Sequence, residues 1–102
     1  MKKSIVVSTS STKFSALAFK EDFEESIKKA ASLSFDGAEL AVRNPKDLKL
    51  ETIVNIIKEN NLEVPAIGTG QAYIEEGLSF SEPNEIVRKM AVERINNQII
   101  FA

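Results

Sequence analysis

The chain has 102 residues, of which 43% are hydrophobic and 27% charged, and its net charge is −2. This composition is that of one small globular domain rather than of a disordered segment. Because there is no excess of basic residues, we expect no binding to nucleic acid or to an anionic membrane surface. The absence of cysteine excludes disulfides and thiolate metal sites. No apolar run reaches the length of a membrane span, so the sequence predicts a soluble, cytoplasmic protein.

Histidine is also absent from the sequence. It is the commonest acid–base group near neutral pH and the commonest metal ligand in proteins. Any catalysis by this chain would therefore depend on carboxylates, on Lys, Arg, Ser or Thr, or on its single tyrosine, Tyr73.

The first half of the sequence predicts a strand, a helix and a second strand. Residues 5–7 form a short β-branched run that is typical of a buried parallel strand. A loop rich in Ser and Thr follows at residues 8–13, and a helix is expected over residues 22–33. Asp22 and Glu25 have the spacing of a capping box at the start of that helix. Residues 35–42 predict the second strand.

The second half repeats this order. We expect a helix over residues 48–60, a strand over 62–69 and a long loop over 70–82. Pro83 then stands where the start of a helix accepts proline. The apolar positions of this third helix are Val87, Met90, Ala91, Ile95 and Ile99.

A strand, loop and helix that recur about every 30–35 residues predict an α/β fold built of three βα repeats with a parallel sheet. The helices would cover one face of the sheet in a barrel, or both faces in a doubly wound fold. The last predicted helix ends on four apolar residues, 99–102, in the middle of its pattern. We therefore expect residues 1–102 to be a single truncated domain whose parent sequence continued into a fourth strand.

Three segments, at residues 5–10, 36–45 and 66–73, resemble the sugar phosphate isomerase/epimerase family. The run Gly-Thr-Gly-Gln-Ala-Tyr at residues 68–73 is the most specific of these matches. Members of this family are xylose isomerase-like (β/α)8 TIM barrels, and the resemblance spans the whole chain but only about three of the eight repeats. It implies that the fold is a partial TIM barrel, consisting of the N-terminal part only.

The resemblance also implies a metal-dependent sugar or sugar phosphate isomerase or epimerase. In the full-length family a divalent metal (Mn, Mg or Zn) is held by Glu, Asp, His and Glu from the second half of the barrel. Those strands are missing from this sequence, so we assign no catalytic residue and no metal ligand to the chain. We expect it to be inactive alone.

Four residues are candidates for the substrate pocket of the parent enzyme: Glu39, Arg43, Gln71 and Tyr73. Each also has a plainer interpretation, which is an exposed carboxylate for Glu39, a solvated strand-end arginine for Arg43, and loop surface for the other two. The Ser/Thr-rich loop at residues 8–13 is either a polyol-binding loop or a polar connector. The GxG at residues 68–70 does not predict a nucleotide site, because no helix is expected at the position of the third glycine.

Two residues depart from what the family resemblance leads us to expect. Ser34 and Asn61 stand where a glycine commonly closes the first and second helices. A left-handed backbone at Ser34 would cost about 1 kcal/mol relative to glycine, and at Asn61 less.

Two further functional hypotheses remain beside that of an inactive N-terminal part. The chain is either a self-assembling interaction module or a split-enzyme subunit completed by a C-terminal partner chain. A three-stranded piece of a barrel leaves strand edges unpaired and helix faces uncovered. We therefore predict a homo-oligomer formed through open sheet edges, such as a dimer or a tetramer.

Overall fold

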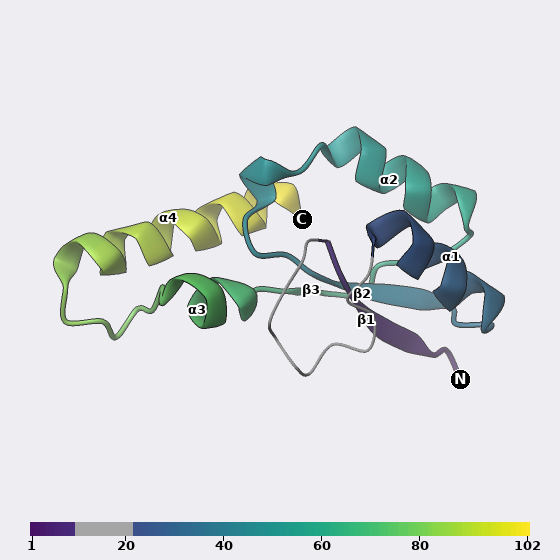
Figure 1. The fold of residues 1–102 in the computed structure, drawn as a ribbon, viewed down its shortest axis with the longest axis horizontal. Coiled ribbons are helices and arrows are strands. Elements are labelled where there is room, and N and C mark those ends of the chain that lie inside the picture. Colours follow the sequence, from purple (N-terminus) through teal and green to yellow (C-terminus); the bar gives the residue numbers. More distant parts are fainter. Residues whose placement is uncertain (10–21) are drawn as a thin grey trace.

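Three parallel strands and four α-helices form the fold in the computed structural model, which describes residues 1–9 and 22–102 (Figure 1). In chain order the elements are β1 (Ser4–Ser8), α1 (Phe23–Ser32), β2 (Gly37–Ala41), the 3₁₀ helix η1 (Pro45–Asp47), α2 (Leu50–Glu59), β3 (Ile67–Gly68), α3 (Gln71–Glu76) and α4 (Glu85–Phe101). The predicted α/β class is confirmed. The Ser/Thr-rich loop predicted at residues 8–13 lies outside the described residues from Ser10 onward.

The sheet has the strand order β1-β2-β3, and both neighbouring pairs are parallel. β1 pairs with β2 over its whole length, whereas β3 contributes only the pairs Leu40–Ile67 and Ala41–Gly68. The strand predicted over residues 62–69 is thus much shorter than expected. Pro65 lies inside that range, and its missing N–H prevents an uninterrupted ladder.

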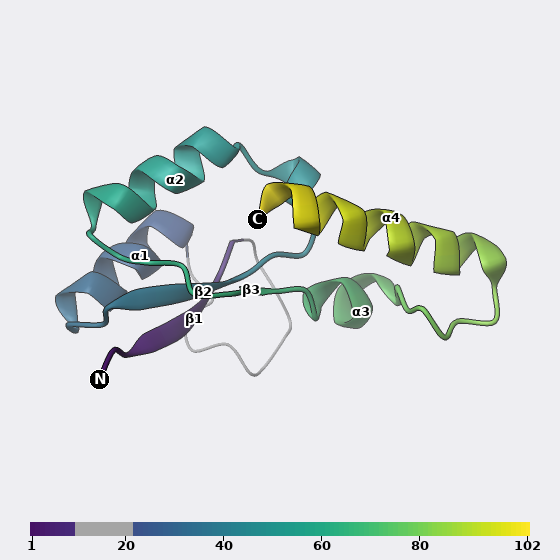
Figure 2. The ribbon, with the colours of Figure 1, turned by 180° about the vertical axis from the view of Figure 1, so that it is seen from behind.

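Helices α1 and α2 lie side by side over one face of the sheet (Figures 1 and 2). Along β2, Ala38 and Leu40 face these helices, so Glu39 and Ala41 face the opposite way. From α1, the side chains that face the sheet are Phe23, Ile27 and Ala30. The buried core consists of Val7, Phe23, Ile27, Ala30, Ala38, Leu40, Val42, Ile53, Ile57 and Leu62.

The ends of α1 and α2 lie close to the ends predicted from the sequence. The Asp22 carboxylate accepts a hydrogen bond from the backbone N–H of Glu25, at 3.3 Å, and so caps α1. Ser34 has φ of 65° and Asn61 has φ of 56°, and both are therefore in the left-handed region. The expectation that these two residues stand at glycine-like positions is confirmed.

The segment after β3 differs from the prediction. The loop expected over residues 70–82 contains α3, which Gly77 closes with φ of 70°. A six-residue helix covers fewer than two turns, and a periodic apolar pattern cannot be recognised over that length. α4 begins at Glu85, where the Asn84 side chain accepts a hydrogen bond from the backbone N–H of Ile86 at 2.9 Å.

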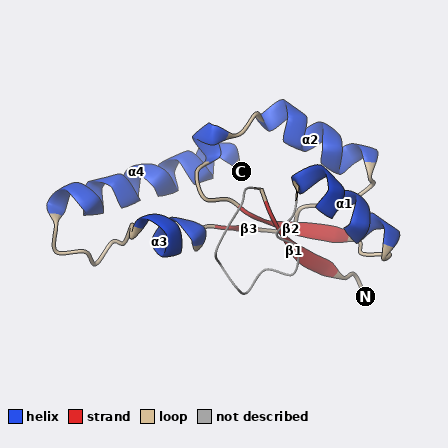
Figure 3. Cartoon of the chain, in the orientation of Figure 1, coloured by secondary structure: helices blue, strands red, loops and turns tan. Residues whose placement is uncertain are grey.

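α3 and most of α4 lie beyond the carboxyl ends of the strands (Figures 1 and 3). This arrangement makes the molecule elongated, with principal extents of 45 × 26 × 26 Å. Only the last turns of α4 return to the sheet, where Phe101 packs against the core and Gln98 is buried. Within the ranges that the structure describes, no helix has the length and apolar character needed to cross a membrane.

Candidate functional site: a cleft at the carboxyl end of β3

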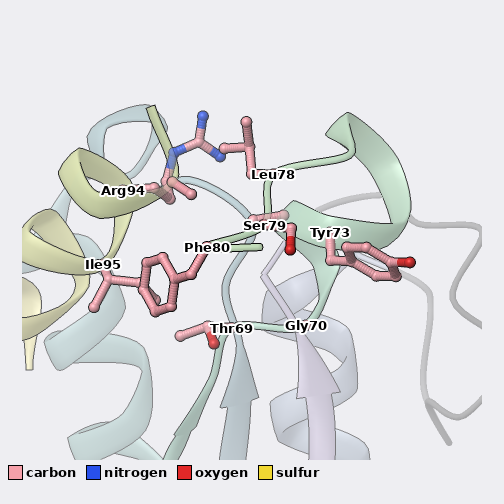
Figure 4. Close-up of a pocket in the computed structure, with 10 residues that line it drawn as sticks. Thr69, Gly70, Tyr73, Leu78, Ser79, Phe80, Arg94 and Ile95 are labelled. Carbon is pink, nitrogen blue, oxygen red and sulfur yellow. The ribbon is translucent and has the colours of Figure 1, made fainter. Parts of the chain in front are cut away.

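A cleft of about 290 Å³ opens just after β3, between α3, the loop that follows it and α4 (Figure 4). Its size is near the lower end of the range of small-molecule sites, about 300–1,000 Å³. Thr69 and Gly70 line it at the end of β3, and Arg94 and Ile95 line it from α4. In parallel α/β folds, ligands bind at the carboxyl ends of the strands. The cleft therefore lies where such a fold places its ligand.

A small apolar cluster holds the two helices of the cleft together. Ala72 on α3, Leu78 after it and Ala91 on α4 are buried against one another. Figure 4 shows the ring of Phe80 next to Ile95, while the ring of Tyr73 extends away from them. Phe80 is 61% exposed, and its ring is therefore available to a ligand in the cleft.

The charged residue that lines the cleft, Arg94, belongs to an ion triad of two arginines and one carboxylate. Arg94 Nη2 donates to Glu76 Oε1 at 3.0 Å, and Arg43 Nε donates to Glu76 Oε2 at 3.1 Å. Arg94 Nη1 also donates to Glu76 and, at 3.0 Å, to the backbone carbonyl of Arg43. The triad thus ties the end of β2 to α3 and α4.

The electrostatic interactions within the triad favour the ionised forms of Glu76 and Arg94. The hydrogen bond from Arg94 lowers the pKa of Glu76, an effect that burial opposes and Arg43 reinforces. The hydrogen bond to Glu76 likewise raises the pKa of Arg94. Since the Arg94 side chain is only 11% exposed, its charge is neutralised inside the protein rather than offered to solvent.

The polar groups left for a ligand are uncharged. Thr69 brings a hydroxyl to the cleft, and so does Ser79, whose Oγ also contacts Ser81 Oγ at 2.9 Å. The Phe80 ring supplies an apolar face beside these hydroxyls. This combination suits a small neutral molecule with hydroxyl groups and an apolar side.

The four residues singled out in the sequence do not form one site. Tyr73 lines the cleft, and Arg43 meets a carboxylate, but that carboxylate is Glu76 of the same chain. Gln71 is buried and donates from Nε2 to Ser8 Oγ at 2.8 Å, so it anchors α3 to the end of β1. Glu39 is half-buried at the middle of β2 and does not line the cleft.

Sequence reasoning missed three residues of this site: Glu76, Phe80 and Arg94. A signal for Arg94 existed, because it shares one side of α4 with Ala91, three positions before it. A charged residue on the buried side of a helix needs a partner. That partner, Glu76, belongs to a helix that was not expected, so the pair was not predictable.

The residues present do not fit the divalent metal that the family resemblance implies. Across residues 1–9 and 22–102, no group of three His, Cys, Asp or Glu side chains could hold a metal ion. Glu76 is already bound by two arginines.

In comparisons with known proteins, no family model matches the chain, and no curated protein matches it significantly.

Proposed function

We propose that this chain forms the first three β/α units of a sugar or sugar phosphate isomerase or epimerase barrel, and that its cleft is part of the wall of the substrate pocket. Support comes from the parallel order β1-β2-β3, in which each strand lies beside the next in sequence, as in a TIM barrel. The observation that carries the proposal is the cleft at the carboxyl end of β3.

The charges of the cleft favour an unphosphorylated sugar over a sugar phosphate. A phosphate group would need a free cation, whereas Arg94 is engaged by Glu76 and by the carbonyl of Arg43. Binding a phosphate there would require breaking a partly buried ion pair. Hydroxyls at Thr69 and Ser79 can instead bind those of a neutral sugar, with the Phe80 ring against its apolar face.

In this proposal the chain binds the sugar but does not catalyse its isomerisation. Isomerisation needs an acid–base pair beside the sugar carbonyl, and no carboxylate of residues 1–9 and 22–102 lines the cleft. Glu76 is held by its arginines, and Glu39 does not line the cleft. The reacting carboxylates and the metal would come from further β/α units, in a longer polypeptide or in a C-terminal partner chain of a split enzyme.

The test is an NMR titration of the ¹⁵N-labelled chain with D-fructose and, separately, with fructose 6-phosphate. We expect saturable shifts of the amides of residues 69–80 with fructose in the millimolar range, and weaker shifts with the phosphate. Phe80→Ala should reduce fructose affinity several-fold. Ile74→Ala is the matched control, because Ile74 is 50% exposed on α3 but does not line the cleft. Shifts that do not saturate, or an equal loss in both variants, would contradict the proposal.

A further inference from the structure

Arg43 and Arg94 hold the carboxylate of Glu76 in the way that arginines hold a bound oxyanion. Arg94 donates from Nη1 to one oxygen of Glu76 and from Nη2 to the other, which is the bidentate arrangement that guanidinium groups form with carboxylates and phosphates. Arg43 Nε adds a third bond, at 3.1 Å to Oε2. The two arginines thus form an oxyanion site, and a side chain of the same chain occupies it.

This oxyanion site borders the cleft. Arg94 lines the cleft, and in Figure 4 its guanidinium group extends toward Leu78, another lining residue. The side chain of Glu76 is 24% exposed, whereas that of Arg94 is only 11% exposed. Glu76 therefore lies between Arg94 and solvent on this side, and removal of its carboxylate would open the guanidinium group to an anion from solution.

Among the described residues, no second carboxylate is bonded to Arg94. Asp47 and Glu93 raise the pKa of Arg94 only through space, with smaller effects than that of Glu76. Glu93 is paired instead with Lys46, at 3.9 Å. Without Glu76, two guanidinium groups would remain close together with no counter-ion in contact, and one of them is largely buried. Such a pair of charges requires an anion.

We propose that Glu76 determines the specificity of the cleft: by occupying the oxyanion site of Arg43 and Arg94, it keeps out the phosphate group of a sugar phosphate. The hydrogen bond from Arg94 lowers the pKa of Glu76, so the carboxylate stays ionised at neutral pH and continues to occupy the site. The choice between neutral and phosphorylated sugars rests on the proposed function, whereas the oxyanion site does not depend on it.

The first test removes the carboxylate and measures the binding of inorganic phosphate by NMR titration. Glu76→Ala should bind phosphate about tenfold more tightly than the wild-type chain, because a bidentate arginine becomes available to it. Glu75→Ala is the matched control, since it removes the same charge from the same helix but from a residue that does not line the cleft. Adding Arg94→Gln to Glu76→Ala should abolish the gain. An equal gain in Glu75→Ala, or a gain that survives the loss of Arg94, overturns the proposal.

The second test asks whether an added anion replaces the lost side chain. Thermal unfolding of Glu76→Ala is measured in sodium phosphate and in sodium chloride of equal ionic strength. Phosphate should raise the Tm of this variant by several degrees more than that of the wild-type chain, because it binds only where the carboxylate is missing. If phosphate stabilises the two proteins equally, or if the variant stays unfolded in phosphate, the proposal is wrong.

The third test concerns specificity and separates this inference from the proposed function. The affinity for fructose 6-phosphate divided by that for fructose should be about tenfold higher in Glu76→Ala than in the wild-type chain. If fructose binds both chains and this ratio does not change, Glu76 does not determine specificity, although the proposed function stands. If neither chain binds fructose but Glu76→Ala gains phosphate binding through Arg94, the proposed function fails and the oxyanion site is supported.

Discussion

Replacing Ser34 with glycine should stabilise the protein, although it removes a side chain. Ser34 follows α1 with φ of 65°, a conformation that costs a residue with a Cβ about 1 kcal/mol relative to glycine. The residue is exposed, and its backbone N–H bond to the Ala31 carbonyl, at 3.0 Å, does not involve the side chain. Because glycine also gains freedom in the unfolded chain, which offsets part of this strain, we expect a net gain of up to about 0.5 kcal/mol.

Urea denaturation followed by circular dichroism measures this change, which corresponds to at most about 2–4 °C in Tm for a domain of this size. Ser32→Gly is the matched control, since Ser32 is equally exposed but lies inside α1. It should destabilise the protein by about 0.5–1 kcal/mol through lost helix propensity and through the loss of its 2.8 Å bond to the Lys29 carbonyl. If both variants lose stability, the left-handed conformation at Ser34 is not a source of strain.

Three further substitutions test the contacts around the sheet and the cleft. Glu76→Gln should cost about 2 kcal/mol at pH 7, since it leaves Arg94 partly buried without its counter-ion. Because the folded pKa of Glu76 is lowered from 4.5, its contribution is present above about pH 4.5 and is lost as pH falls through the lower folded value. Urea titrations at several pH values should therefore show a flatter acid decline in the variant, and parallel curves would contradict this account. Gly37→Ala should cost about 1–3 kcal/mol, because a Cβ there would meet the Glu63 carbonyl oxygen at 2.8 Å. Gly70→Ala is the control for Gly37→Ala, because an added Cβ there meets nothing within 4 Å and φ is −59°. It should be neutral or slightly stabilising in the same urea denaturation experiments.

Local sequence signals were sufficient to predict the first two βα units. The apolar pattern of residues 5–7 and the capping pair Asp22 and Glu25 marked β1 and α1, and both elements formed close to the expected places. Ser34 and Asn61 marked the left-handed helix ends. These features depend on interactions within a few residues, and such interactions can be read from sequence.

The third unit and the cleft depend on contacts that are distant in sequence. α3 is too short to show a period, and it is held by Ala72, Leu78 and Ala91 packing between α3 and α4. The triad likewise joins Arg43 with residues 33 and 51 positions further along the chain. The sequence suggested Arg43 as a candidate for the substrate pocket, but it did not predict that Arg43 would pair with a carboxylate of the same chain.

The buried bond between Gln71 and Ser8 has a consequence for the order of folding. It spans 63 residues and is made by the first residue of α3 to the last residue of β1. A helix of six residues is far too short to persist alone in water. α3 is therefore expected to form only after β1 and β2 have paired, because the end of β1 must be in place to receive it. Closing so long a loop is slow compared with forming α1 or α2. The cleft after β3 would accordingly be among the last parts of the molecule to assemble and among the first to open.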